Sequence, residues 1–212
     1  MMKRLAAIAV IGAVIGGAGA IYVMRGPGGN APPADCAATT ASQAALKPLA
    51  RGQVAGVLVH DRPRALPDLS YLGPDGAPAR LADLRGKTVL LNMWATWCVP
   101  CREEMPALDS LQAQLGGPDF EVLAVSLDTQ GVDRARDFLS EIGVGHLTFR
   151  IDPSGRLFQE LKKVGRGVGL PTSLLIDAKG CEIAYLPGPA DWASEDARAL
   201  VQAAVKGTAR GS

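Results

Sequence analysis

Apolar positions in the second half of the chain predict an alternation of buried strands and amphipathic helices. Residues 88–95 (TVLLNMWA) and 120–127 (FEVLAVSL) are almost entirely apolar, as expected of strands buried on both faces. Between them, residues 98–115 carry apolar side chains at helical spacing, at Met105, Leu108, Leu111 and Leu115. Two buried strands joined through a helix are normally parallel neighbours in one sheet. The pattern therefore predicts an α/β fold.

Shorter patterns and turn residues predict the rest of the domain. Residues 172–177 and 181–186 flank a turn that contains Gly180 and predict an antiparallel hairpin, so the central sheet should be mixed. A last helix is predicted over 192–206, with Asp191 as its N-cap and Gly207 just past its end. Further helices are predicted over 37–46, 132–142 and 154–162, a β-hairpin extension over 69–72 and 79–84, and a strand over 147–151.

The beginning of the chain has a different character. An uncharged run over residues 5–24 is preceded by Lys3 and Arg4 and ends at Arg25. At about 1.5 Å per residue, a helix of this length would span about 30 Å, which matches the hydrocarbon core of a bilayer. Because cations that flank a membrane helix stay in the cytoplasm, residues 1–4 are predicted to be cytoplasmic and the rest of the chain to be exported.

We interpret residues 5–24 as an uncleaved transmembrane anchor. The alternative is a signal peptide cleaved after Ala20, although the apolar run continues past that point. Residues 25–50 are predicted to form a Gly/Pro-rich tether and a leading helix, followed by an exported domain over 51–208. These features predict a single-pass protein of the inner (cytoplasmic) membrane with its domain in the periplasm.

The charge balance restricts the possible partners. The chain has 22 Lys and Arg against 21 Asp and Glu, and removing residues 1–24 lowers the basic count to 20. Proteins that bind nucleic acid normally show a basic excess or a basic face. We therefore expect no nucleic-acid partner, no attachment to the membrane beyond the anchor, and a monomer.

The most specific chemical motif is Cys98-Val99-Pro100-Cys101, at the junction between the first buried strand and its helix. A C-x-x-C pair occurs in haem attachment sites, zinc sites and redox-active dithiols. Haem attachment requires a histidine directly after the second cysteine, where this chain has Arg102. A structural zinc site needs four ligands and no second pair accompanies this one, so no metal site is predicted. A copper(I) site remains an alternative, because two thiolates suffice for a soft monovalent ion.

The position at a helix N-terminus favours redox chemistry. Cys98 falls at the first turn, where unpaired N–H groups and the helix dipole stabilise a thiolate. Cys101 falls one turn deeper on the same face, close enough for a disulfide and more shielded. Cys98 is therefore the predicted nucleophile and Cys101 the predicted resolving thiol. Pro100 has no N–H to leave unsatisfied and favours the φ angle of a first helical turn.

The segment WATWCVPC after a buried strand, together with the later Gly169-Leu170-Pro171-Thr172, resembles the TlpA branch of the thioredoxin superfamily. Members of this branch are membrane-anchored periplasmic thiol:disulfide oxidoreductases, and the resemblance covers roughly residues 65–206. It implies a thioredoxin-like fold and a cis Leu170–Pro171 bond that faces the nucleophilic cysteine. No cofactor is expected.

A substrate-docking surface is expected around these motifs. The cis proline should hold the Leu170 backbone toward an incoming substrate strand. Trp97 is expected to be partly exposed and to belong to this surface, together with Val99 and Pro100. Trp94 lies within the predicted strand and is expected in the core.

One position departs from the usual thioredoxin pattern. Typical thioredoxins carry a buried Asp six residues before the nucleophile, whereas this chain has Asn92 there, which cannot exchange a proton. Relatives of the TlpA branch use a glutamate three residues after the resolving cysteine, and Glu104 matches that position. In an apolar cleft its pKa would be raised, and it could take the proton from Cys101. The alternative is a solvated helix residue beside Glu103.

Cys36 and Cys181 are isolated in the sequence. In an exported chain two leftover thiols usually pair, so we expect a structural disulfide that clamps the leading helix to the domain. The chain-entropy model gives such a long loop at most about 5 kcal/mol of stabilisation. TlpA-like proteins have the same arrangement.

Two functions from different classes are consistent with these residues. The first is a reductase of client disulfides, and because Val99 and Pro100 offer no charge or side-chain donor to a thiolate, we expect a reducing couple. The resemblance implies clients among copper-handling factors of cytochrome oxidase assembly, and a membrane thiol transporter as electron donor. The second is a copper(I) carrier that uses the same cysteine pair. Titration of the reduced protein with copper(I) discriminates between them.

Overall fold

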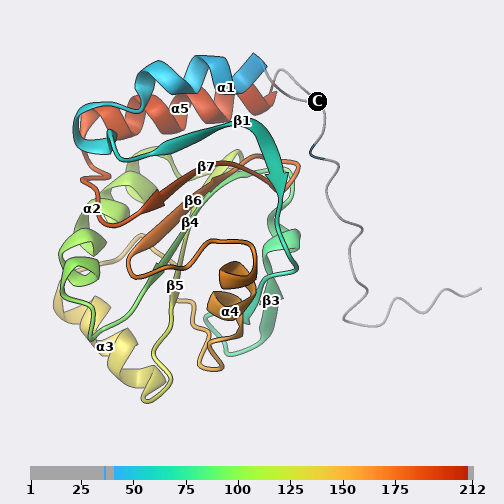
Figure 1. The fold of residues 1–212 in the computed structure, drawn as a ribbon. Coiled ribbons are helices and arrows are strands. Elements are labelled where there is room, and N and C mark those ends of the chain that lie inside the picture. The colour runs from blue at the N-terminus through green and yellow to red at the C-terminus, as the bar shows by residue number, and fades with distance from the viewer. Residues whose placement is uncertain (1–35, 37–40, 210–212) are drawn as a thin grey trace, which may run out of the picture. The chain divides into compact units, whose positions relative to one another are not determined.

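The central feature of the fold is a mixed five-stranded sheet (Figure 1). The structure is a computed structural model and describes residues 36 and 41–209. β4 and β5 are parallel, and the other neighbouring strands are antiparallel, so the predicted mixed sheet is confirmed. In spatial order the strands are β1 (Leu58–Ala65), β7 (Cys181–Pro187), β6 (Thr172–Ile176), β4 (Thr88–Trp94) and β5 (Phe120–Ser126).

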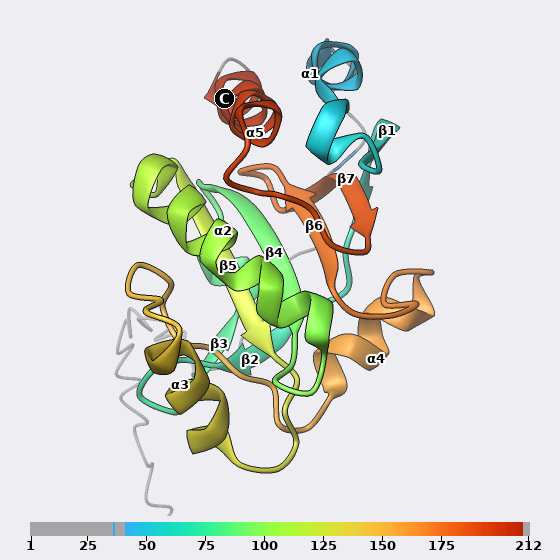
Figure 2. The same ribbon diagram turned by 90° about the vertical axis from the view of Figure 1, so that its left-hand side faces the viewer.

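Both faces of the sheet are covered (Figure 2). Side chains of β4 alternate between two cores, with Leu90 and Trp94 in the first and Leu91 and Met93 in the second. This explains why β4 is buried along its whole length. The first core packs against α1 (Ala41–Leu46), α2 (Val99–Leu115), α3 (Val132–Glu141) and α5 (Glu195–Ala209). The second packs against α4 (Arg156–Lys163) and the hairpin of β2 (Ser70–Leu72) and β3 (Pro78–Arg80).

β1 is a strand that the sequence pattern did not predict. It lies at the edge of the sheet, half of its side chains are polar, and most of them are exposed. Pro63 falls where the register between β1 and β7 is irregular, and an edge strand tolerates a proline there because one of its sides has no strand neighbour. The apolar run by which the buried strands were identified is therefore missing from β1.

Two predicted strands are shorter in the structure. After β3, residues 81–84 form a 3₁₀ helix instead of continuing the strand predicted over 79–84. The Asp83 carboxylate accepts a hydrogen bond from Arg80 N at 2.8 Å and so caps this turn. Within the strand predicted over 147–151, Ile151 alone makes β-bridges.

The last helix begins and ends later than predicted. Asp191 accepts a hydrogen bond from Ala193 N, which closes a turn ahead of the helix. Ser194 takes the N-cap role instead, because its Oγ accepts from Ala197 N. α5 therefore begins at Glu195, and Gly207 lies inside it rather than past its end.

The predicted anchor over residues 5–24 lies outside the described residues, as do 25–35 of the predicted tether and 37–40 of the leading helix. α1 is the described part of that helix. No helix within residues 36 and 41–209 is long and apolar enough to cross a membrane.

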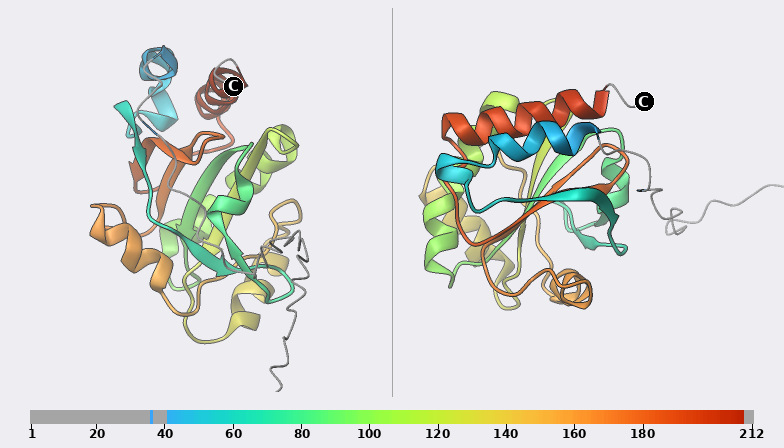
Figure 3. Two further views of the ribbon diagram at one scale, coloured as in Figure 1. Left: turned by 90° about the vertical axis from the view of Figure 1, so that its right-hand side faces the viewer. Right: turned by 45° about the horizontal axis from the view of Figure 1, so that its top comes forward.

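A disulfide joins Cys36 to Cys181, and the two Cα atoms are 5.7 Å apart. Cys181 is buried at the start of β7. α1, which follows Cys36 in the chain, lies along α5 (Figure 3). The disulfide expected from the two isolated cysteines is thus present, and it ties the segment ahead of α1 to the sheet.

We expect the Cys36–Cys181 disulfide to survive a mild reductant that opens Cys98–Cys101. Cys181 is 1% exposed at the start of β7, whereas Cys98 is 6% exposed and lies at the end of a helix. After treatment with one equivalent of dithiothreitol, thiol counting should find two free thiols per chain, both in the peptide that contains residues 98–101. Free thiols in the peptides that contain Cys36 or Cys181 would contradict this assignment.

Candidate active site

The two cysteines of the C-x-x-C motif form a disulfide at the N-terminus of α2. Cys98 is the N-cap residue, and its Sγ accepts a hydrogen bond from Cys101 N at 3.3 Å. The side chains differ in accessibility, since Cys98 is 6% exposed and Cys101 is 0% exposed. Cys98 is thus the cysteine that a partner's sulfur can approach, and it also lies closest to the positive end of the helix dipole.

The Leu170–Pro171 bond is cis and directly precedes β6. Thr172 on β6 pairs with Met93 on β4, one residue before β4 ends and the chain turns toward Cys98. This register places Pro171 next to the C-terminal end of β4, where the loop to Cys98 begins. Two hydrogen bonds hold the segment in place: Thr172 Oγ1 donates to Gly169 O at 2.8 Å, and Gly188 N donates to Pro171 O at 2.9 Å.

Exposed apolar side chains accompany both motifs. Trp97 is 66% exposed and Val99 is also exposed, and they flank Cys98 in the chain. Val168, three residues before Pro171, is 78% exposed and was not identified from the sequence. Among the other predicted docking residues, Pro100 and Leu170 are half-buried and Pro171 is buried. Trp94 lies in the core, as predicted.

Glu104 is buried, with 4% of its surface exposed, so the alternative of a solvated helix residue is wrong. Its Oε1 accepts hydrogen bonds from Trp192 Nε1 and from Ala190 N, and its Oε2 accepts from Asn92 Nδ2 at 3.3 Å. Burial raises the pKa of Glu104 to about 7, because the three hydrogen bonds offset only part of the desolvation of the carboxylate. A carboxyl group with this pKa can exchange a proton near neutral pH.

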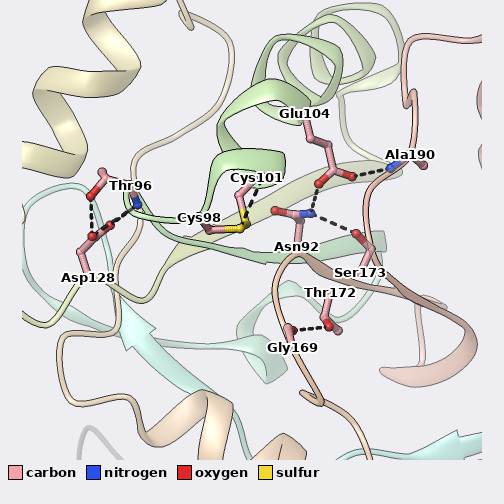
Figure 4. The surroundings of a disulfide bond; sticks show 10 residues. All are labelled: Asn92, Thr96, Cys98, Cys101, Glu104, Asp128, Gly169, Thr172, Ser173 and Ala190. Carbon is pink, nitrogen blue, oxygen red and sulfur yellow. Dashed lines mark hydrogen bonds between the residues drawn. A yellow bond between two sulfur atoms is a disulfide. The ribbon is translucent and has the colours of Figure 1, made fainter.

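Asn92 lies between Glu104 and the disulfide (Figure 4). Its amide Nδ2 donates to Glu104 and, at 3.0 Å, to Ser173 Oγ on β6. The side chain is completely buried. Asn92 occupies the position of the usual thioredoxin Asp and contacts the glutamate that is expected to replace it.

A buried carboxylate that sequence reasoning missed, Asp128, fixes the loop before Cys98. It accepts hydrogen bonds from Thr96 N at 3.0 Å and from the Thr96 hydroxyl group at 2.7 Å (Figure 4). It also accepts a hydrogen bond from the Ser126 hydroxyl group at 2.7 Å. These bonds hold the backbone one residue before Trp97. The signal in the sequence was a single Asp shortly after the buried strand β5, at the carboxyl end where parallel strands carry functional residues.

A second missed cluster fixes the loop before Pro171. The Arg166 guanidinium donates to Glu182 Oε1 at 2.6 Å, and His60 Nε2 lies 2.8 Å from the same oxygen. The guanidinium also lies over the Tyr185 ring, 4.6 Å from its centroid. Arg166, His60 and Glu182 are all buried. Their positions are far apart in the sequence, and each resembles a surface residue when it is considered alone.

The residues that the structure describes contain no group of three or more His, Cys, Asp or Glu side chains placed to hold a metal ion. A metal in this region would have to rely on Cys98 and Cys101 after reduction.

Known proteins resemble this chain in sequence and in fold. Residues 62–201 match the family model described as Redoxin. The thiol-disulfide oxidoreductase ResA of Oceanobacillus iheyensis is 39% identical over 109 residues, which are 50% of this chain and 52% of the relative. The thiol:disulfide interchange protein CycY of Rhizobium leguminosarum bv. viciae is 34% identical over 132 residues, which are 57% of this chain and 66% of the relative. The chain thus spans between about half and two thirds of these curated relatives.

A solved structure supports the same conclusion about the fold. The thiol:disulfide interchange protein, a thioredoxin family protein from Chlorobium tepidum, is 28% identical to this chain with a TM-score of 0.57. The match covers 68% of this chain and 97% of that one. The predicted thioredoxin-like fold is confirmed.

Glu104→Gln should change how stability depends on pH. Because burial raises the pKa of Glu104 from 4.5 to about 7, the folded protein binds more protons than the unfolded chain in that window. The wild type therefore loses about 3 kcal/mol of stability as the pH rises through the window, at about 1.4 kcal/mol per pKa unit. Glutamine cannot ionise, so the variant should gain that amount relative to the wild type, measured by urea unfolding with both disulfides intact.

Glu103→Gln is the matched control, because Glu103 is the exposed neighbour on the same helical turn. Its stability relative to the wild type should stay nearly constant over the same pH range. A Glu104→Gln difference that is equally constant would show that Glu104 does not bind a proton in this window.

Proposed function

Because the chain belongs to the Redoxin family, we propose that it is a thiol-disulfide oxidoreductase that reduces disulfides in client proteins. One observation supports this most directly. A cysteine pair at the N-terminus of α2 has one member that is slightly exposed, Cys98, and one that is completely buried, Cys101, near a cis proline and exposed apolar side chains. This arrangement suits a reaction in which one thiol meets a protein partner and the other releases it.

The proposed reaction exchanges one disulfide for another in two steps. In the first, the Cys98 thiolate attacks a sulfur of the client disulfide, which forms a mixed disulfide and releases one client thiolate that takes up a proton. In the second, Cys101 loses its proton and attacks Cys98, which forms the Cys98–Cys101 disulfide seen in the structure and releases the second client sulfur as a thiol. The client gains two electrons and two protons. The protein loses the two electrons, the proton of Cys101 and the proton that Cys98 released when it formed its thiolate.

Glu104 is proposed to accept the proton that Cys101 loses in the second step. The two residues are one turn apart on α2, and both are buried. A thiol in such a place cannot transfer its proton directly to water. A neighbouring carboxylate with a pKa of about 7 is the group best matched to accept it.

The client is proposed to bind as an extended segment with apolar side chains beside its cysteine. Trp97, Val99 and Val168 offer exposed apolar surface on both sides of the site. The couple is proposed to be reducing, because the residues between the cysteines are Val99 and Pro100. A redox potential above about −150 mV would contradict this direction.

The cellular setting is proposed from the sequence. The uncharged run over residues 5–24 supports a TlpA-type protein that is anchored in the inner membrane, with the domain in the periplasm. The Cys36–Cys181 disulfide supports an oxidising compartment. The proposed electron donor is a membrane thiol-reducing transporter, and the proposed clients are copper-handling factors in cytochrome oxidase assembly.

Single cysteine variants should behave differently toward a disulfide-containing peptide that has Leu or Val beside its cysteines. Cys101→Ser should accumulate a mixed disulfide with the peptide, because attack proceeds and resolution cannot. Cys98→Ser should accumulate none, because the remaining thiol is buried. Non-reducing gel electrophoresis and mass spectrometry would show the adduct. Equal trapping by both variants would contradict the assignment of nucleophile and resolving thiol.

Glu104→Gln should leave the attack by Cys98 intact and slow the release of the reduced peptide, since its role is to deprotonate Cys101. The defect should be largest near pH 6 to 7 and should fade at high pH, where the Cys101 thiol loses its proton unaided. Rapid-quench measurements of the two steps across pH test this. Profiles of variant and wild type that run parallel at every pH would remove Glu104 from the reaction.

A further inference from the structure

Asn92 carries a buried carbonyl oxygen, Oδ1, that has no hydrogen-bond partner among the described residues. The rest of the side chain is fully engaged, because Nδ2 donates to both Glu104 and Ser173. Buried acceptors in folded proteins are nearly always paired, and leaving one unpaired costs free energy. An orphaned oxygen next to a reactive pair of sulfurs therefore requires an explanation.

The unpaired oxygen faces the disulfide. Asn92 lies on the same face of β4 as Leu90 and Trp94, and both of these belong to the core that contains Cys98 and Cys101. Its hydrogen bond to Glu104, one turn beyond Cys101 on α2, fixes the nitrogen end of the amide on the far side. Figure 4 shows the oxygen end directed toward the sulfur atoms and the nitrogen end directed toward Glu104 and Ser173.

The structure contains the oxidised pair, in which neither sulfur carries a hydrogen. A dithiol donor reduces the pair by transferring two electrons and two protons, so that the S–S bond breaks, two S–H groups form and the donor becomes a disulfide. One of the new S–H groups belongs to Cys101, which has no exposure to solvent. The Cys101 S–H group is a hydrogen-bond donor that needs an acceptor inside the protein. The unpaired oxygen of Asn92 lies in the direction of this sulfur.

We propose that Asn92 Oδ1 accepts a hydrogen bond from the Cys101 thiol in the reduced protein, and that Asn92 is a positioning residue which favours the reduced state. The inference rests on the proposed redox role of the cysteine pair. The unpaired oxygen raises the free energy of the oxidised protein, and the hydrogen bond formed on reduction removes this penalty. Removing the Asn92 oxygen by substitution should shift the equilibrium between dithiol and disulfide toward the disulfide about tenfold. For a two-electron couple, this shift is about 30 mV.

The S–H stretching band of Cys101 in the infrared spectrum tests the contact directly. In Cys98→Ser, with the Cys36–Cys181 disulfide intact, Cys101 holds the one thiol of the chain. Its band should lie at lower wavenumber than the band of a simple alkyl thiol dissolved in hexane, where the S–H group has no hydrogen-bond acceptor. A band at the hexane position would overturn the proposal, and this measurement requires no change at Asn92.

Variants of Asn92 and its neighbour separate the two ends of the amide. Asn92→Leu in the Cys98→Ser background should move the band to the unbonded position. Ser173→Ala is the matched control, because it removes a partner of Nδ2 and leaves Oδ1 untouched, so the band should stay in place. A band that does not move in Asn92→Leu, or that moves equally in Ser173→Ala, would overturn the proposal.

The redox equilibrium with dithiothreitol supplies the energetic test in the protein with both active-site cysteines. Asn92→Leu should make the potential about 30 mV more negative, while Ser173→Ala should leave it within error. An unchanged potential in Asn92→Leu would overturn the energetic part of the inference. None of these measurements uses a client, so a protein that fails to reduce clients but shows the shifted band would contradict the proposed function and leave this inference standing.

Discussion

The burial of one carboxyl group, that of Glu104, constrains the arrangement of the whole site. Its two oxygens accept hydrogen bonds from the Trp192 indole, the Ala190 backbone and the Asn92 amide, so α2, β4 and the segment before α5 converge on one group. All three donors are neutral, and a buried acid held by neutral donors is destabilised when it ionises. A role in structure alone would be filled better by an amide. The chain therefore keeps an energetically costly group one helical turn from Cys101, the thiol that loses its proton in the proposed reaction.

Irregular backbone around the sulfurs is fixed by other buried acids. Asp128 satisfies the backbone and hydroxyl group of Thr96, and Glu182 holds Arg166 in the loop before the cis proline. Both loops leave regular strands or helices and would otherwise lack hydrogen-bond partners for their polar groups. The exposed apolar surface is thus carried by segments that the interior holds rigidly, which lowers the entropy lost when a partner binds.

Sequence reasoning succeeded where chemistry or periodicity is local. The apolar runs of β4 and β5, the cysteine spacing and the helix that follows are all contained within short windows. It failed where a residue acquires its role from distant partners. In the sequence, Arg166 and Glu182 resemble surface residues, and only the fold brings them together. Likewise, β1 has no apolar run of its own and is a strand because it pairs with β7. The role of Glu104 was inferred from a resemblance to a family. Its buried environment depends on distant residues such as Trp192, which donates a hydrogen bond to it and lies 88 positions further along the chain.

The attachment point at Cys181 determines how the domain would respond to force. β7 begins at the end of the sheet where β6 finishes and β4 starts, whereas the cysteine pair of α2 lies beyond the opposite end of β4. Whatever precedes Cys36 is thus covalently attached at the end remote from the reactive sulfurs. Tension on that segment passes through the sulfur–sulfur bond into the sheet and bypasses α1, so this short helix carries no load. The cysteine pair therefore lies at the end of the sheet opposite to the point where such a force would enter.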